Sequence, residues 1–362
     1  MVRGEDGTVS RDLRSDRRTD TVSVILPNYN HARYLEQSIS AVLRQTRPAE
    51  QVVIIDDGST DGSLQLIERL VAGNPTVEVI RNARPSGVVS AMNQGLALAR
   101  GTLVAMLAAD DMVFPTFFER STALLNQHPD AAFSCALTEI WDEDGEVTGS
   151  RPFLRPALRE RYFSPDATRQ LLRKGDNYFL AASSLFRYSK IAEMGGFKGS
   201  LASAADGFLQ RRMAVRWGFC FIPAPLAAWR LHGANYSQAS VTNPESLNEM
   251  LAQITRQINA EPAGLFPDGY AELFERRLRF GAGRLIASRL PADPVASDQI
   301  AKCIKAGSIE RRWLATLART GRLSPRLMIA WLALRNRPFS PWWTLAESTS
   351  LATGRRRGSS SQ

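Results

Sequence analysis

The sequence predicts an α/β fold, in which a mostly parallel β-sheet is covered by helices and followed by a helical region. Two observations indicate this fold. In the first 110 residues, short aliphatic runs alternate with segments of helical periodicity, as in βαβ units. From about residue 240 onward, only the helical periodicity remains.

The individual elements follow from the same patterns. The first strands are expected over residues 21–30, 51–57, 76–80 and 102–107. The helices between them are expected over residues 31–45, 59–73 and 87–101. Ser59 or Thr60 is the expected N-cap of the second helix. Two later strands and two later helices are expected over residues 131–137, 183–187, 244–258 and 269–290.

Two of the strands run directly into paired aspartates, at 56–57 and at 110–111. Ligands of parallel sheets bind beyond the carboxyl ends of the strands, so we expect a site at this edge. Carboxylates can hold a hard divalent cation beside phosphates, and they can act as general bases. The sequence has no dinucleotide fingerprint, Walker A motif, HExxH or GxSxG that would indicate another chemistry.

Structural explanations compete with these functional ones. Helix capping could account for Asp57 and for Asp110. An ordinary loop position could account for Asp206 and His232. His31 is expected at the surface.

The composition excludes several classes of protein. Cys135, Cys220 and Cys303 are far apart and the chain has three histidines, so we expect reduced cysteines, a cytoplasmic location and no zinc site. No apolar run reaches the ~20 residues that span a bilayer. The first twenty residues lack the apolar core of a secretory signal.

The net charge of +9 is concentrated near the C-terminus: from residue 301 onward, the sequence has twelve Lys and Arg residues and two Glu residues. No nucleic-acid motif accompanies this charge, so nucleic acid is not the expected partner. Tryptophans lie between the arginines, and this favours peripheral contact with an anionic membrane surface. A solvated basic face of a helical region is the alternative.

Six blocks of the sequence carry a family likeness: VSVILPNYNHARYLEQSISAVLRQT, VVIIDDGSTDGS, GVVSAMNQGLALARGTLVAMLAADDMVFP, SSLFRYSKIAEMGGF, AADGFLQRRM and PLAAWRLHGANYS. In this order, over about 22–238, they resemble the family 2 glycosyltransferases. The resemblance implies a GT-A fold, which is a Rossmann-like αβα sandwich. It also implies four segments: a disordered tail (1–20), a GT-A domain (21–238), a helical region (239–350) and a disordered basic tail (351–362).

The resemblance assigns nucleotide-binding roles to four residues. Asp57, the second aspartate of the block IIDDGSTD, would hold the nucleotide base, which is typically uracil in this family. Pro27 and Tyr29 would line the same pocket. Asn93, in AMNQG, would lie near the nucleotide.

The resemblance places the metal at Asp110. The family has an Asp-x-Asp motif at this point, and Asp110 takes the position of its last aspartate. Ala108 stands where the first aspartate would be, so one contact is missing. Asp111 is a secondary candidate. Mg²⁺ or Mn²⁺ is the implied ion, and Mg²⁺ sites of this kind need only one or two carboxylates beside the substrate phosphates.

The general base would be Asp206, in the position of the aspartate of a Glu-Asp pair that follows GGF in the family. Ala205 replaces the glutamate of that pair. Arg230 and His232 match a Tyr-Arg-x-His element near the diphosphate, with Trp229 in place of the tyrosine.

These assignments imply an inverting transferase that moves a sugar from a nucleotide sugar, most simply a UDP-sugar, to a glycan or lipid-linked acceptor. The signature and membrane spans of processive synthases are absent, which favours single transfers. Ala108 and Ala205 leave open a non-catalytic nucleotide-sugar-binding relative. A nucleotidyltransferase would need a Gly-rich, basic loop after the first strand, and the sequence has none.

Overall fold

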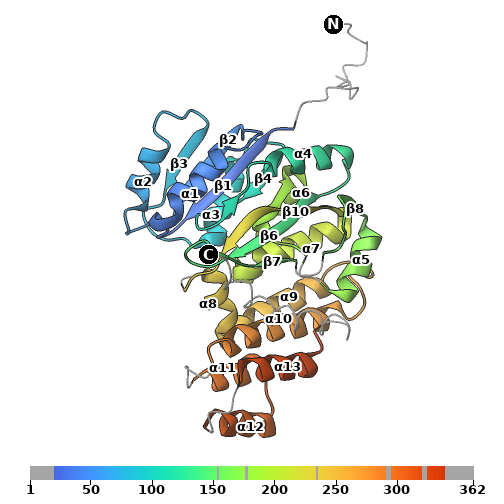
Figure 1. Cartoon of the computed structure of the whole chain (residues 1–362). Helices are drawn as coiled ribbons and strands as arrows, with labels where there is room; N and C mark the ends of the chain where they lie inside the picture. Colours follow the sequence, from blue (N-terminus) through green and yellow to red (C-terminus); the bar gives the residue numbers. More distant parts are fainter. Residues whose placement is uncertain are drawn as a thin grey trace, which may run out of the picture.

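The computed structural model describes residues 20–152, 155–175, 178–233, 235–290, 295–319 and 324–338. A ten-stranded sheet forms the α/β part, and a stack of helices lies beyond one end of it (Figure 1). The expected α/β class with a helical C-terminal region is confirmed. The predicted tails at 1–20 and 351–362 fall almost wholly outside the described residues.

The strands of the sheet are β1 (Val22–Asn28), β2 (Gln51–Asp56), β3 (Val77–Arg81), β4 (Leu103–Met106), β5 (Met112–Val113), β6 (Phe133–Trp141), β7 (Val147–Arg151), β8 (Arg161–Phe163), β9 (Ser184–Arg187) and β10 (Phe219–Arg230). The main order is β3-β2-β1-β4-β9-β6-β10-β5, and β7 and β8 pair with β6 and β10. The pairs of β1 with β2 and β4, and of β2 with β3, are parallel, as predicted. β9 is antiparallel to both β4 and β6, so the sheet is mixed beyond its first four strands.

The helices of the α/β part are α1 (Ala32–Leu43), α2 (Ser63–Leu70), α3 (Val88–Leu98), α4 (Phe117–Gln127), α5 (Pro165–Lys174), α6 (Tyr188–Glu193) and α7 (Ala205–Trp217). Alternate residues of β1 face opposite sides of the sheet. Val24 and Leu26 pack in the core under α1, α2 and α4, whereas Ile25 packs in the core that includes α3 and α7. Helix α3 approaches the sheet closely at Gly95, where a Cβ would lie 2.3 Å from Cγ2 of Ile25.

The predicted start of the second helix was wrong. Helix α2 begins at Ser63, and its N-cap is Gly62 with a φ of 86°. Ser59 and Thr60 instead contact Asn28 and Asn30 at the end of β1. Glycine supplies the left-handed turn at no steric cost, so the chain can complete a loop at the strand end before the helix starts.

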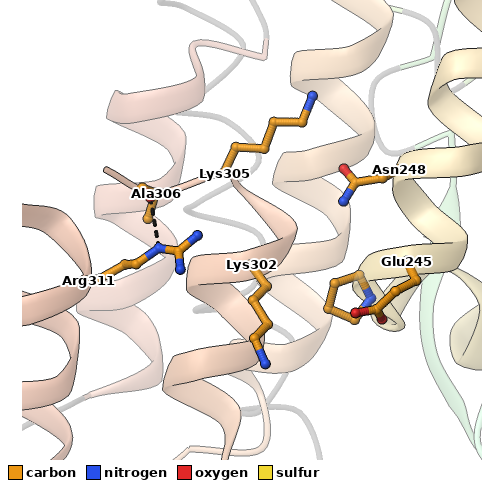
Figure 2. A pocket seen from close by; sticks show the side chains of 7 residues that line it. Glu245, Asn248, Lys302, Lys305, Ala306 and Arg311 are labelled. Atoms are coloured by element: carbon orange, nitrogen blue, oxygen red, sulfur yellow. Dashed lines mark hydrogen bonds between the residues drawn. The ribbon is translucent and has the colours of Figure 1, made fainter. Parts of the chain in front are cut away.

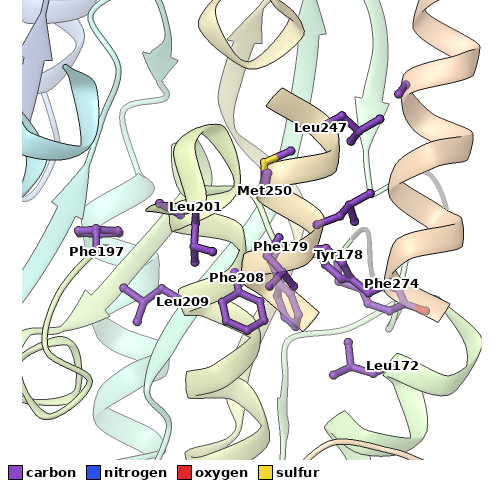
Figure 3. Packing of buried hydrophobic residues seen from close by; sticks show 14 of the residues in the cluster. Leu172, Tyr178, Phe179, Phe197, Leu201, Phe208, Leu209, Leu247, Met250 and Phe274 are labelled. Atoms are coloured by element: carbon purple, nitrogen blue, oxygen red, sulfur yellow. The ribbon is translucent and has the colours of Figure 1, made fainter. Parts of the chain in front are cut away.

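The later helices are α8 (Tyr236–Thr242), α9 (Pro244–Asn259), α10 (Tyr270–Ala287), α11 (Ala296–Cys303), α12 (Ser308–Arg319) and α13 (Pro325–Asn336). Figure 3 shows Phe208 of α7 among Phe179, Met250 and Phe274, so side chains from the α/β part and from α9 and α10 share one apolar cluster. Asn243 caps α9 by accepting a hydrogen bond from the Ser246 N–H. Among the described helices, none combines the length and apolarity required to cross a bilayer.

Candidate active site

The paired aspartates lie at one edge of the sheet, as the strand pattern predicted. β1 lies between β2 and β4, and all three run parallel. Asn28 at the end of β1 is level with Asp56 at the end of β2 and donates a hydrogen bond to its carboxylate at 2.9 Å. Asp56 also accepts from the Ser59 N–H, so this aspartate holds the turn after its strand.

Asp57 is buried and holds the loop that follows β3. Its Oδ1 accepts hydrogen bonds from Asn82 Nδ2 at 2.7 Å and from the N–H and hydroxyl of Ser86. Its Oδ2 accepts from the N–H groups of Ser86 and Gly87. Burial favours the neutral acid, but these donors outweigh burial and lower the pKa of Asp57 below 3.8. The carboxylate is therefore ionised at neutral pH, and it does not cap helix α2.

Asp110 is buried against two residues of the segment after β10. His232 Nε2 lies 2.8 Å from Asp110 Oδ2, and Asn235 Nδ2 donates to the same oxygen at 3.3 Å. Asn235 also accepts from the His232 N–H and donates to the Arg230 carbonyl, which fixes the loop. Burial raises the pKa of Asp110, but hydrogen bonding to His232 and the nearby His31 lower it to a net value below 3.8. Asp110 does not cap helix α4.

His31 lies beside this pair and is partly exposed, so the expected surface position still brings its imidazole to the site. Side-chain nitrogens of His31 and His232 and an oxygen of Asp110 all lie within 4.8 Å of one another. The two imidazole rings meet edge to face at 5.7 Å, and Tyr34 packs on His232 at 5.2 Å. Two imidazoles and a buried carboxylate at this spacing could hold a divalent cation.

Asp111 and Asp206 bring two further carboxylates to the same region. Asp111 is buried and accepts a hydrogen bond from the Arg230 N–H at 3.0 Å. Burial, followed by repulsion from Asp110, raises the pKa of Asp111 well above 3.8, and Asp206 adds to this repulsion. Sites separated by almost a hundred residues therefore act on one another electrostatically.

Asp206 lies in the first turn of α7, not in an exposed loop. Its Oδ1 accepts a hydrogen bond from the Gly207 N–H at 2.6 Å. Burial raises the pKa of Asp206, and the Gly207 N–H and the Arg211 guanidinium oppose this rise only in part. Its neighbour Ala205 is 2% exposed and belongs to the core, so the residue beside Asp206 does not face the site.

Arg230 is 4% exposed and is fixed by the protein itself. Its guanidinium lies 5.0 Å from the ring centre of Tyr34 and 5.4 Å from that of Trp141. It donates hydrogen bonds to the carbonyls of Asp110 and Glu143 and to the side chain of Gln37. The side chain thus lies next to Asp110, and its donors hold the surrounding loops.

The remaining predicted residues are separate from the Asp110 cluster. Pro27 and Tyr29 lie at the carboxyl end of β1, and Tyr29 is 47% exposed. Asn93 of α3 uses both ends of its amide on the backbone of Phe197, donating to the carbonyl at 2.8 Å and accepting from the N–H at 3.0 Å. Ala108 is exposed.

Sequence reasoning missed four residues that complete the site: His31, Tyr34, Asn82 and Asn235. His31, Tyr34 and Asn235 lie inside blocks that carry the family likeness, so their sequence context was a usable signal. Asn82 follows β3 as the aspartates follow β2 and β4, and the same reasoning about strand ends could have found it.

A cavity of about 380 Å³ lies elsewhere, in the helical region. It is lined by Pro244, Glu245, Asn248, Lys302, Lys305, Ala306 and Arg311. Lys302 and Lys305 extend away from each other in Figure 2, and their amino groups pair with Asp298 and Glu275. The cations therefore do not converge on one ligand, and we place the active site at the carboxylates.

Sequence comparisons identify the family of the chain. The model of glycosyl transferase family 2 matches residues 23–194. An uncharacterized glycosyltransferase of Nostoc sp., alr2836, is 32% identical over 232 residues, covering 62% of this chain and 69% of the relative. An uncharacterized glycosyltransferase of Haemophilus influenzae is 26% identical over 240 residues, covering 65% of this chain and 72% of the relative.

Solved structures share the fold. A complex of S. aureus TarS with UDP-GlcNAc matches with a TM-score of 0.59 at 16% identity, over 88% of this chain and 92% of that one. The mannosyltransferase PcManGT from Pyrobaculum calidifontis, in complex with GDP-Man and Mn²⁺, matches with a TM-score of 0.54 at 20% identity, over 93% and 86%. From the family match and the sequence relatives, we conclude that this chain is a glycosyltransferase and belongs to family 2.

Proposed function

We propose that the protein moves a sugar from a nucleoside-diphosphate sugar, with a UDP-sugar as the first candidate, to a hydroxyl of a glycan or lipid-linked acceptor. One observation carries the proposal: the adjacent Asp110 and Asp111, which follow β4, lie close enough to Asp206 of α7 for Asp206 to repel Asp111 electrostatically. The nucleotide-sugar complexes of the two structural relatives support a donor of this class.

Asp206 is the proposed general base. The acceptor oxygen attacks the anomeric carbon, the bond from that carbon to the diphosphate oxygen breaks, and the hydroxyl proton passes to the carboxylate. A raised pKa makes Asp206 a stronger base than an exposed aspartate. Attack opposite the leaving group inverts the configuration at the anomeric carbon.

Asp110, His232 and His31 are the proposed ligands of a divalent cation. When bound, the ion would offset the charge that develops on the leaving diphosphate. Mg²⁺ prefers oxygen ligands, whereas imidazole suits transition metals. Between the two expected ions, the two histidines favour Mn²⁺ over Mg²⁺.

The nucleotide is proposed to bind between the ends of β1 and β2, beside Pro27, Tyr29 and Asp57. The Asp57 carboxylate already accepts hydrogen bonds from the loop after β3, so we assign it to shaping the base pocket through that loop. Asn93 is assigned a positioning role, because it fixes the loop at Phe197.

We propose that the acceptor is a lipid-linked glycan and that the enzyme works at the cytoplasmic face of a membrane. Support comes from the excess of Lys and Arg after residue 301. In this proposal, the C-terminal helices make a peripheral contact with the membrane.

The test is sugar transfer from UDP-, GDP- and dTDP-sugars with Mn²⁺, followed by mass spectrometry of the products. Asp206→Asn is expected to bind UDP like the wild type in calorimetry and to lose transfer. Asp144→Asn, at a side chain that is 84% exposed, is the matched control. Donor binding without turnover in the wild type would instead favour a non-catalytic binding protein, and full turnover in Asp206→Asn would exclude this base.

A further inference from the structure

Helix α13 is apolar on two sides. Its inner side packs Met328, Leu332 and Ala333 into the core against α10. On the outer side, Leu327 is 70% exposed and Leu334 is 74% exposed. A helix with apolar residues on two sides normally has both of them covered, so we expect a partner on the outer side.

The exposed side continues onto helix α12. Leu327, Trp331 and Leu334 follow the spacing i, i+4, i+7, so they form one stripe along α13. The ring of Trp313 on α12 packs 5.1 Å from that of Trp331. Ile309, one turn before Trp313, is 83% exposed. We call these five residues the C-terminal apolar face.

The charges around this face have one sign. Arg312, Arg326 and Arg337 are exposed on the two helices and at the end of α13. Glu310 is the only carboxylate in the sequence between Asp298 and Glu347, and Arg335 neutralises it through bonds of 2.7 and 2.9 Å. No free negative charge therefore interrupts the basic border in the described part of these helices.

We infer that the C-terminal apolar face docks on an anionic lipid surface, with its leucines and tryptophans at the acyl boundary and its arginines at the headgroups. This inference rests on the proposed function, for which it names the membrane-contacting residues. Arginines can extend toward headgroups while their aliphatic stems cover apolar surface. A symmetric contact between two copies would instead bring the same arginines together, and like charges disfavour it.

The experiment is cosedimentation of the full chain with vesicles of phosphatidylcholine alone or mixed with phosphatidylglycerol. We expect binding to the mixed vesicles only, weakening with salt. Leu327→Ser with Leu334→Ser should weaken it about tenfold or more, since both side chains would leave the acyl boundary. Arg326→Gln with Arg337→Gln should weaken it about 25-fold.

Matched controls separate this face from general effects. Leu158→Ser changes a leucine that is 85% exposed in the α/β part, and it should bind vesicles like the wild type. Arg44→Gln with Arg69→Gln should likewise change little, because both arginines lie exposed on the α/β part.

Three results would overturn the inference. They are no binding of the wild type to either vesicle, equal binding by the leucine double variant, or a lipid-free dimer that this variant dissociates. The last result would assign the face to a second copy. Vesicle binding does not require catalysis, so it tests the membrane contact alone. UDP affinity, measured on the same samples, tests the proposed function independently of the membrane contact.

Discussion

Asp57→Asn should destabilise the fold by removing an ionised acceptor from a buried cluster of donors. With the amide nitrogen at the Oδ2 position, it would face the N–H groups of Ser86 and Gly87, which now donate at 2.9 and 2.8 Å. Hydrogen bonds to charged groups contribute about 1.5–3 kcal/mol each, and the loop can relax partly toward water. We therefore expect a loss of about 2–4 kcal/mol in the free energy of unfolding.

The assay is urea denaturation followed by tryptophan fluorescence, with Asp144→Asn as the exposed control. The pKa of Asp57 is lowered in the folded state, so its stabilisation is fully present above the unfolded value. It is lost as the pH falls through the lower folded value, so the gap between wild type and variant should close only in acid. A change within about 0.5 kcal/mol at pH 7, the range of ordinary surface substitutions, would refute this account of Asp57.

Three further predictions concern the site and its support. Asp206→Asn should lower the transfer rate about 10²–10⁴-fold, and a rate like that of the wild type would contradict the assignment. Because burial raises the pKa of Asp206, the wild-type rate should fall with acid at a pH above 3.8. His31→Gln should weaken Mn²⁺ binding about tenfold, as measured by electron paramagnetic resonance. His128→Gln is the control and should leave Mn²⁺ binding unchanged. Equal effects of the two variants would exclude His31 as a ligand. Gly95→Ala should lower the melting temperature, because the new Cβ would overlap Ile25. Gly199→Ala is the control and should leave the melting temperature unchanged, because the space around Gly199 is open. Equal melting temperatures for the two variants would show that α3 can shift.

Sequence periodicity predicted the sheet edge well, because β1, β2 and β4 are buried aliphatic runs that lead into polar residues. The placement of Asp110 beside β1 follows from topology alone once the strands are parallel. The start of α2 was missed because Gly62 allows a left-handed turn that delays the helix beyond its capping-type residues. The preference of serine for helix N-caps favoured Ser59 as the cap of α2. The loop instead packs against β1, and the helix starts later.

The proximity of His31 to His232 was not predicted from the sequence, although His232 was itself a candidate site residue. His31 and His232 are two hundred residues apart, and no spacing rule links them. The end of β10 reaches Asp110 because β10 pairs with β5, which begins two residues after Asp110. The surroundings of Arg230 were also not predictable from the sequence. The family resemblance placed this residue near the diphosphate, and the structure adds that it is buried between Tyr34 and Trp141 and that its donors bind the protein.

Calorimetric titration of UDP into the protein with and without Mn²⁺, for the wild type and Asp110→Asn, tests the central claim most directly. The account predicts that wild-type binding depends on Mn²⁺ and that the variant loses about 10–100-fold in metal-dependent affinity. Equal UDP affinity in EDTA, or a variant that binds UDP and Mn²⁺ like the wild type, would contradict a metal-assisted donor site at Asp110.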